Sequence, residues 1–488
     1  MEPRHCDALF IGGRWVKPST AEQIAVISPH TEEEIACVAA AGPEDMHRAV
    51  AAARQAFDSG PWPRMRAAER AECMERLLRL LQEHSNEFAQ LITREMGSPI
   101  TFSQLGQTMA SAMVLEYYVG LARTFPFEEV RHGFMGPVVV RREAVGVAAC
   151  IVPWNVPLFT TMLKLGPALT AGATVVLKPA PETPLDALLL GELIERAEIP
   201  PGVVNIVPAG REAGEVLVCH PGVDKVAFTG STAAGRRIAS LCGEQLKRVT
   251  LELGGKSAAI VLDDADLATT LAGLVPAILM NNGQACVAQT RVLVSRRRYS
   301  EFVDALAAAF QEATVGDPQD PSTVVGPLVS ARQRDRVEGY LRLGVEEGAK
   351  VVCGGGRPAH LPRGWYVEPT VFAEVDNRMR IAQEEIFGPV AAVIPYENEE
   401  QAIAIANDSH YGLSGTVWTA DVQRGLEVAR QVRTGTYTVN GFALEFGAPF
   451  GGFKASGLGR ELGPEGLQAY LEAKAISLPA GTQPALRF

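Results

Sequence analysis

The chain has 488 residues and a mass of 52.2 kDa, a length that favours two or three domains over a single core. Its hydrophobic content of 47% is enough to fill those cores. The 56 acidic residues outnumber the 45 basic residues and give a formal charge of -11, which disfavours nucleic acid and anionic membranes as partners.

The N-terminus and the apolar segments predict a soluble cytoplasmic protein. The segment MEPRHCDALF has no basic stretch followed by an apolar region, as a secretory signal would. The longest nearly apolar run, from Leu267 to Met280, is shorter than a membrane-spanning helix requires. The eight cysteines form no CxxC motif and none pairs with a histidine at metal-ligand spacing, so we expect neither a disulfide framework nor a metal site.

The first predicted elements are helices. Segments 44–57 and 65–97 carry apolar residues at helical spacing, with charged residues between them. A β-hairpin is predicted over 125–145, where turn residues cluster around Gly133.

From residue 144 onwards, short β-branched runs alternate with amphipathic segments, and a second alternating block runs from 257 to about 435. This alternation predicts doubly wound parallel sheets and two α/β domains. The strands of the first block are predicted at 144–155, 173–179, 203–208, 224–230 and 248–255, with helices at 158–169, 185–197, 213–219 and 232–241.

The segment FTGSTAAG, residues 228–235, follows a predicted strand and opens a predicted helix. Gly230 and the backbone N–H groups near Ser231 could approach a phosphate at the positive end of the helix dipole. The segment is not a GxGxxG fingerprint, and a serine at such a turn is more often only the N-cap of its helix.

Three polar residues stand on or at the ends of predicted strands: Glu252 in LELGGKS, Asn155 in PWN and Lys178 in VVLKP. Burial would raise the pKa of Glu252 towards that of a general base, although a structural ion pair is an equally good interpretation. The Asn155 amide could donate to an oxyanion, or it could stabilise a turn. Lys178 could contact a ribose or a phosphate, or it could extend to solvent.

The segment NNGQAC, residues 281–286, ends in a cysteine that differs from the other seven. Most of those lie among Ala, Val and Leu, which is typical of small core residues, whereas Cys286 follows a polar turn containing Gly283. A thiolate there attacks carbonyl carbon, and its own backbone N–H can help Asn155 to hold the oxygen that becomes negative. With Glu252 and the dinucleotide turn, these residues form a complete set for oxidising an aldehyde through a thioester.

These motifs resemble the NAD(P)-dependent aldehyde dehydrogenases of the non-acylating, hydrolytic type. The similarity spans nearly the whole chain, and the spacing of Glu252 and Cys286 also fits the family. The motifs that occur in family order are PWN, LKP, FTGSTAAG, LELGGKS, NNGQAC, EEIFGP, NDSHYGLSG and PFGGFKASGLGRELG.

The resemblance implies an aldehyde-dehydrogenase-like α/β fold, with a Rossmann-type cofactor domain, an α/β catalytic domain and a small β oligomerisation arm. The cofactor domain is expected over 1–124 and 146–256, and the catalytic domain over 257–455. The arm and the C-terminal segment are expected over 125–145 and 456–488. Relatives form homodimers or homotetramers, and the sequence does not choose between them.

The resemblance also implies roles for individual residues. Cys286 attacks the aldehyde to give a thiohemiacetal, whose oxyanion Asn155 and the Cys286 N–H stabilise. Hydride then passes to the nicotinamide, and Glu252 activates the water that hydrolyses the thioester. Lys178 is expected both among the catalytic residues and among the cofactor contacts. The expected cofactor contacts are Ile151, Val152, Trp154, Lys178, Gly230, Ser231, Gly235, Leu253, Glu385 and Phe387.

NAD is the expected cofactor, with NADP as an alternative. Many NAD-preferring relatives carry a glutamate three residues after the lysine, where it binds the adenosine ribose and repels a 2′-phosphate. This chain has Pro181 at that position, and Glu182 is one residue further on.

The residues near the aldehyde are expected to be apolar. Alignment of the motifs places Val156, Leu163, Leu444 and Phe450 at the aldehyde tunnel. This set favours a nonpolar aliphatic or aromatic aldehyde, although some of the four could be ordinary core residues.

Three other functions fit the sequence less well than aldehyde oxidation does. Coenzyme-A-acylating relatives usually lack the water-activating glutamate, so Glu252 argues against that activity. A cysteine hydrolase needs a histidine base, and none of the eight histidines lies in a recognisable nucleophile–base motif. A non-catalytic protein on this fold would be expected to have lost Cys286 or Glu252, and both are present.

Overall fold

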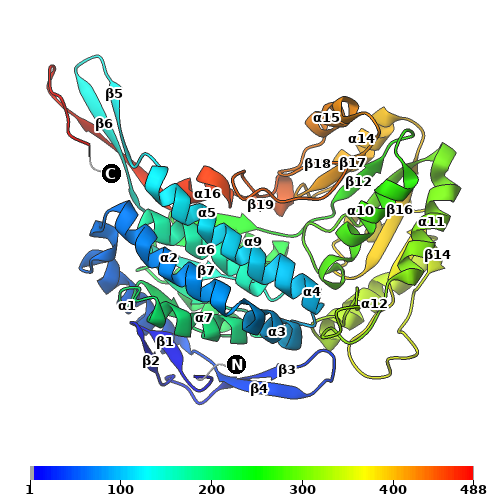
Figure 1. The fold of residues 1–488 in the computed structure, drawn as a ribbon, viewed down its shortest axis with the longest axis horizontal. Coiled ribbons are helices and arrows are strands. Elements are labelled where there is room, and N and C mark those ends of the chain that lie inside the picture. The colour runs from blue at the N-terminus through cyan, green and yellow to red at the C-terminus, as the bar shows by residue number, and fades with distance from the viewer. Residues whose placement is uncertain (1–4, 487–488) are drawn as a thin grey trace.

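In a computed structural model that describes residues 5–486, the chain forms two large α/β bodies and a projecting three-stranded arm (Figure 1). The α/β class predicted from the sequence is confirmed. Residues 1–4 and 487–488, at the outer ends of the predicted domains, lie outside the described part of the chain.

The first sheet has eight strands, and its parallel core follows the doubly wound order β9-β8-β7-β10-β11. In this order the chain turns back at β7, so the carboxyl ends of β7 and β10 flank the usual position of a ligand crevice. The core strands are β7 (Val147–Ile151), β8 (Thr174–Lys178), β9 (Val204–Ile206), β10 (Lys225–Thr229) and β11 (Arg248–Glu252). The antiparallel strands β1 (Leu9–Ile11), β2 (Arg14–Val16) and β19 (Gly457–Leu458) complete its edges.

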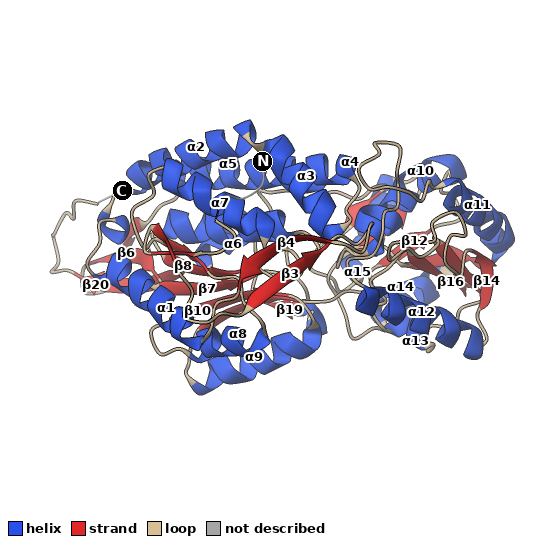
Figure 2. Cartoon of the chain, turned by 90° about the horizontal axis from the view of Figure 1, so that it is seen from below, coloured by secondary structure: helices blue, strands red, loops and turns tan. Residues whose placement is uncertain are grey.

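Helices cover both faces of this sheet, because alternate side chains of each strand point to opposite sides (Figure 2). One face packs against α2 (Ala67–Glu83), α3 (Ser85–Met96), α5 (Ala110–Thr124), α6 (Pro157–Ala171) and α7 (Leu185–Arg196). The other face packs against α1 (Pro43–Asp58), α8 (Arg211–Cys219) and α9 (Thr232–Glu244).

Two details of the helical layer differ from the simple sequence pattern. The stretch predicted as 65–97 is two helices, because the chain breaks at His84 between α2 and α3. After α3, the short α4 (Ile100–Phe102) leads into the π-helix η2 (Ser103–Met109), which continues into α5. A separate hairpin, β3 (Gln23–Ile27) and β4 (Glu34–Ala39), precedes α1.

The second sheet has the order β14-β15-β16-β13-β12-β17-β18 and is parallel except at β14. Its strands are β12 (Ala258–Val261), β13 (Arg291–Ser295), β14 (Lys350–Cys353), β15 (Thr370–Ala373), β16 (Val390–Tyr396), β17 (Gly415–Trp418) and β18 (Thr438–Val439). One face packs on α10 (Leu267–Leu279) and α11 (Tyr299–Glu312), and the other on α12 (Ala331–Glu346), α13 (Arg380–Gln383), α14 (Glu399–Asn407) and α15 (Val422–Gln431).

The arm consists of β5 (Glu128–His132), β6 (Pro137–Ala144) and β20 (Leu471–Ser477), in the order β20-β6-β5. It projects from the first body at the end opposite the second sheet (Figure 1). The segment that precedes β20 belongs to the first body, since β19 pairs with β11 and α16 (Gly463–Gln468) packs on α6.

Within the described residues, no cysteine forms a disulfide bond. Over residues 5–486, no helix is long and apolar enough to cross a membrane. Within the same range, no group of three His, Cys, Asp or Glu side chains is placed to hold a metal ion.

The start of the central strand β7 depends on a close contact with Asp224. The Asp224 carboxylate accepts hydrogen bonds from the Val147 N–H at 2.7 Å and from the Arg54 guanidinium at 2.6 Å. Gly146 has φ +124, and a Cβ at this position would overlap Asp224 Oδ2. Glycine is therefore needed here for both backbone conformation and space.

We expect Gly146→Ala to lower the free energy of unfolding by about 3 kcal/mol, because overpacking adds to backbone strain. Gly348→Ala is the matched control: Gly348 has φ +98 but nothing within 4 Å of the added Cβ. The control should lose only about 1 kcal/mol. Urea denaturation of both variants measures the difference, and equal losses would show that the Asp224 contact contributes nothing.

Candidate active site

Cys286 follows a turn with an unusual backbone. Asn281, Asn282 and Gly283 have consecutive positive φ angles of 52, 63 and 70. Asparagine and glycine tolerate this conformation better than other residues do. A Cβ on Gly283 would overlap the Gly388 carbonyl, so the turn packs directly on the EEIFGP segment.

The end of β11 lies against the same loop. Glu252 is the last residue of that strand, and the two glycines after it have no side chains to separate the backbones. A Cβ on Gly255 would overlap the Cys286 carbonyl, and one on Gly254 would lie 2.5 Å from Glu385 Oε2. The Gly255 N–H donates to Glu385 Oε1 at 3.0 Å. Three segments far apart in the sequence therefore meet at the cysteine.

The Cys286 thiol is half-buried in an acidic environment. Burial, followed by the carboxylates of Glu385 and Glu252, raises the pKa of the thiol to about 12. Burial also raises the pKa of Glu385 to about 7. Without an added positive charge in the site, the thiol is protonated at neutral pH.

Glu252 is buried, with an exposed fraction of 3%. Neither of its carboxylate oxygens accepts a hydrogen bond from any residue that the structure describes, so the structural ion pair considered above is not formed there. Burial, and then the nearby Glu461, raise the pKa of Glu252 well above its usual value. A carboxyl group in this state is suited to proton transfer near neutral pH.

Asn155 follows β7 and reaches the cysteine loop. Its Nδ2 donates to the Gln284 carbonyl at 2.8 Å, two residues before Cys286. One N–H of the amide remains for an oxygen atom bound beside the thiol. Asn155 and Cys286, which are distant in the sequence, are thus brought together.

The predicted phosphate turn lies between β10 and α9. The Ser231 hydroxyl accepts the Ala234 N–H at 3.3 Å, so it is the N-cap of α9. The Gly230 N–H donates to the Glu252 carbonyl at 3.0 Å, which ties this turn to the end of β11. The positive end of α9 therefore opens at the crevice beside β7.

Four other predicted cofactor residues pack the walls of that crevice. Ile151 and Val152 are buried at the end of β7. Gly235 lets α9 approach Leu253, since a Cβ there would overlap the leucine side chain. These residues shape the backbone around the crevice and offer no polar side chain to it.

An aromatic pair spans the two bodies at the mouth of the crevice. The rings of Trp154 and Phe387 are 5.3 Å apart in an edge-to-face arrangement at 83°. Phe387 has a positive φ of 65 and follows Glu385 by two residues. The pair closes the space between the end of β7 and the EEIFGP segment.

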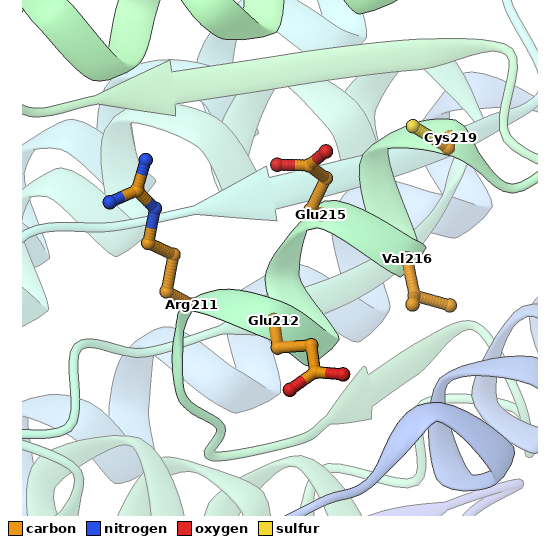
Figure 3. Close-up of a pocket in the computed structure, with 5 residues that line it drawn as sticks. All are labelled: Arg211, Glu212, Glu215, Val216 and Cys219. Carbon is orange, nitrogen blue, oxygen red and sulfur yellow. The ribbon is translucent and has the colours of Figure 1, made fainter.

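Lys178 lies beside a different feature, a pocket on α8 of about 640 Å³. Its ammonium donates to the carbonyls of Pro179 at 2.7 Å and Ala209 at 2.9 Å, and burial lowers the pKa of Lys178 to about 8. Its stem lies 3.3 Å from the position of a Cβ on Gly214 of α8. The pocket is lined by Arg211, Glu212, Glu215, Val216 and Cys219, with Arg211 and Glu215 extending from one side of the helix (Figure 3).

The four predicted tunnel residues belong to the apolar cluster against which Cys286 packs. Leu163 and Phe450 are buried within it, whereas Val156 and Leu444 are half-buried at its edge. Other half-buried aromatic residues of this cluster were missed, because they stand in no recognised motif. They are Tyr117, Phe442 and Phe446.

Comparison with known proteins identifies the family. The model of the aldehyde dehydrogenase family matches residues 15–476, which is nearly the whole chain. The chain belongs to the aldehyde dehydrogenase family. The predicted family, fold and enzyme class are confirmed.

Three similar aldehyde dehydrogenases align with this chain over almost the full length of both proteins. A geranial dehydrogenase of Castellaniella defragrans is 47% identical over 96% of this chain and 98% of that protein. An aldehyde dehydrogenase of Mycobacterium tuberculosis, solved in complex with NAD+, is 50% identical with a TM-score of 0.97, covering 98% of this chain and 99% of that chain. One from Pseudomonas syringae, solved with NAD+ and octanal, is 42% identical with a TM-score of 0.95, covering 97% of each.

A buried ion pair that the sequence patterns did not predict lies near Glu252 in this aldehyde dehydrogenase. Lys164 Nζ lies 2.6 Å from Glu461 Oε1 and donates to Thr229 Oγ1, also at 2.6 Å. Thr229 is the partner of Glu252 in the β10–β11 register, and Lys164 opposes the rise in the pKa of Glu252. The available signal was a single lysine in the otherwise uncharged segment of α6, since a charge inside such a helix needs a partner.

The effect of the nearby carboxylates on the pKa of the Cys286 thiol can be tested in the enzyme without cofactor. At about pH 9, Glu252→Gln should speed alkylation of Cys286 by iodoacetamide about threefold, because loss of a carboxylate lowers the thiol pKa. Alkylation is followed by mass spectrometry of the peptide that contains Cys286. The exposed Glu346→Gln on α12 is the control and should leave the rate unchanged. Slower alkylation of the Glu252 variant would instead mean that Glu252 takes the thiol proton.

Proposed function

We propose that this aldehyde dehydrogenase oxidises a nonpolar aldehyde to its carboxylic acid, with NAD as hydride acceptor and Cys286 as nucleophile. The observation that carries the proposal is the convergence of three segments, which brings Cys286, the unpaired Glu252 and the amide of Asn155 to one place. Each of the three has the chemistry that its step requires.

The residues at the crevice fit a dinucleotide. The positive end of α9 at Ser231 and the buried ammonium of Lys178 supply positive potential, and the Trp154–Phe387 pair offers aromatic surface. NAD, when bound, accepts hydride from the substrate carbon. Two similar aldehyde dehydrogenases were solved in complex with NAD+, which supports NAD here.

NADP remains the alternative because of Pro181, which brings no carboxylate to repel a 2′-phosphate. Glu182, the next residue, pairs with Arg332 at 3.3 Å. This pairing draws the charge of Glu182 towards the second body, so it is a weaker source of repulsion than an unpaired carboxylate.

The chain's own residues divide the reaction between them. The Cys286 thiol releases its proton to solvent water, the thiolate forms a carbon–sulfur bond with the aldehyde carbon, and Asn155 Nδ2 and the Cys286 N–H donate to the resulting oxyanion. Loss of hydride from that carbon leaves a thioester. Glu252 then accepts a proton from the attacking water, the carbon–sulfur bond breaks, and the acid leaves. The Lys164–Glu461 pair behind Glu252 is placed to adjust its proton affinity.

A nonpolar substrate is supported by the walls around the thiol. Val156, Leu444, Phe442 and Phe446 pack against the cluster that includes Cys286, and none of them carries a charge. A charged substrate would lose hydration in such a space without gaining a partner. Among similar proteins, one is a geranial dehydrogenase and another was solved with octanal.

The arm supports a homodimer or a homotetramer. Both β20 and β5 are outer strands of its sheet, and free strand edges pair readily with another chain. The hairpin tip also exposes Phe134 and Met135, which are more than 80% exposed. We propose that the cofactor domain, the catalytic domain and the arm correspond to the eight-stranded, seven-stranded and three-stranded sheets. A cytoplasmic location stays a prediction from the sequence.

Substitution of the nucleophile and of the base separates the two halves of the reaction. Cys286→Ala should abolish aldehyde oxidation while leaving NAD affinity within about twofold, because the thiol forms the covalent intermediate. Glu252→Gln should give a burst of NADH followed by turnover at least about a hundredfold slower than wild type, because deacylation needs the base. Stopped-flow absorbance of NADH measures both phases. Unchanged steady-state turnover of the Glu252 variant would remove it from the mechanism.

The cofactor and substrate classes are tested with the wild-type enzyme. NAD and NADP reduction is measured with a panel of aliphatic, aromatic and carboxylate-bearing aldehydes. We expect kcat/KM to be at least about tenfold higher for nonpolar aldehydes than for carboxylate-bearing ones, because the site offers no partner for a second charge. A preference for a carboxylate-bearing semialdehyde would contradict the proposed substrate class.

A further inference from the structure

Four buried amide side chains join the loop of Asn155 to the turn of Cys286. They are Gln107, Asn155, Asn281 and Gln284, and none is more than 5% exposed. Gln107 comes from the π-helix η2, Asn155 from the loop after β7, and the other two from the NNGQAC turn. Buried amides are costly unless they are hydrogen-bonded, so their arrangement needs a reason.

The hydrogen bonds of this amide cluster converge on Asn155. Asn281 Nδ2 donates to the Asn155 carbonyl at 2.8 Å and to the Gln284 carbonyl at 3.3 Å. Gln107 Nε2 donates to the same Asn155 carbonyl at 3.3 Å. The Asn155 side chain donates in turn to the Gln284 carbonyl at 2.8 Å. The side-chain nitrogens of Gln107, Asn155 and Asn281 each face a backbone carbonyl, so the orientation of these three amides is determined by their acceptors. The Gln284 side chain is instead oriented by the Val329 N–H, from which it accepts a hydrogen bond at 3.1 Å.

Asn155 is thereby held at both ends. Its backbone carbonyl is fixed by Asn281 and Gln107, and its side-chain nitrogen is fixed by Gln284. The remaining N–H of Asn155 Nδ2 can then point in only one direction, which is the condition for a preorganised oxyanion donor. A donor that pivots by a small distance loses much of its effect on the transition state.

The backbone of the turn carries strain that this arrangement explains. Asn281 has φ 52, a conformation that costs a non-glycine residue about 1 kcal/mol or more. Its side chain makes one longer local bond, to the Gln284 carbonyl at 3.3 Å. Its shorter bond, at 2.8 Å, reaches across to Asn155, a residue far away in the sequence. Gln107 likewise sits in a π-helix, a rare element that occurs often at functional sites.

We propose that Asn281 is a positioning residue for aldehyde oxidation: it aims the oxyanion donor of Asn155, and Gln107 supports it from η2. The inference rests on the proposed oxyanion role of Asn155. Asn281 acts through Asn155 and touches neither the substrate nor the thiol.

The first test is Asn281→Gly. Glycine accepts a φ of 52 without strain, so this change removes the side-chain amide and leaves the backbone conformation available. The NADH burst should slow about tenfold to thirtyfold, less than the loss of an oxyanion donor itself. Alkylation of Cys286 by iodoacetamide forms no oxyanion, so its rate should stay within about twofold of wild type. A burst within twofold of wild type, or an equal fall in both rates, would overturn the proposal.

The neighbouring Asn282→Gly is the matched control, because Asn282 has a similar φ of 63. Its amide bonds elsewhere, donating to the carbonyls of Gly97 and Pro327 and accepting from the Gly326 N–H. The control loses more hydrogen bonds, so its Tm should fall at least as much as that of Asn281→Gly. Its burst should slow less than about threefold, since no bond to Asn155 is lost. An equally slow burst would mean that general loosening of the turn is responsible.

A double-mutant cycle with Asn155→Ala separates this proposal from the proposed function. If Asn281 acts through Asn155, then adding Asn281→Gly to Asn155→Ala should slow the burst by less than about twofold. If the full effect of Asn281→Gly persists in that background, the positioning role is wrong while the oxyanion role of Asn155 stands. If Asn155→Ala alone leaves the burst unchanged, the oxyanion role fails, and the positioning role fails with it.

If the Asn281→Gly variant does not fold, Gln107→Met can be combined with Asn155→Ala in the same kind of double-mutant cycle. Methionine keeps a similar volume and helix propensity but donates no hydrogen bond. When Asn155 is present, we expect Gln107→Met to slow the NADH burst about twofold to fivefold. In the Asn155→Ala background, adding Gln107→Met should leave the burst unchanged. Equal effects in both backgrounds would overturn the supporting role.

Discussion

The active site of this aldehyde dehydrogenase depends on the close approach of two backbones. Gly254 and Gly255 lie two and three residues after the end of β11. A Cβ on Gly254 would overlap the Glu385 carboxylate, and one on Gly255 would overlap the Cys286 carbonyl. This contact joins the first sheet to the second and places Glu252 beside the thiol. The strained turn before Cys286 lies on one side of this contact, and the predicted phosphate turn before α9 lies on the other. Glu252 and Cys286 belong to different bodies, so this close contact is what brings them together.

Burial then gives these groups their chemical character. Burial raises the pKa of both the Cys286 thiol and the Glu252 carboxyl, and nearby carboxylates add to the rise: Glu385 and Glu252 act on the thiol, and Glu461 acts on Glu252. Glu252 has no hydrogen-bond donor in the described part of the chain, whereas the nearby Glu461 has Lys164. The site therefore stabilises one buried carboxylate and leaves the other available for proton transfer. A fully paired Glu252 would be more stable and a weaker base.

Structural and functional roles overlap at several residues. Ser231 is an N-cap, and it also stands at the positive end of a helix that opens on the crevice. Gly235 allows helix α9 to pack on β11, and it thereby brings that helix end close to the crevice. Leu163 and Phe450 are core residues of the cluster that surrounds the thiol. For such residues the structural role is compatible with the proposed functional one, because the wall of a site is also part of the core.

The sequence by itself determined the α/β class, the approximate element boundaries of the first α/β block and the choice of Cys286, Glu252 and Asn155 as candidate site residues, because these features depend on local patterns. Periodicity, turn residues and short motifs are properties of neighbouring residues. Only the tertiary structure decided which distant residues meet: the Lys164–Glu461 pair, the Trp154–Phe387 contact and the amides around Asn155. In the sequence Lys164 looks like an isolated charge, and Glu461 stands directly after Arg460, far from Lys164. Their partners are set by strand order and helix packing, which no local pattern encodes.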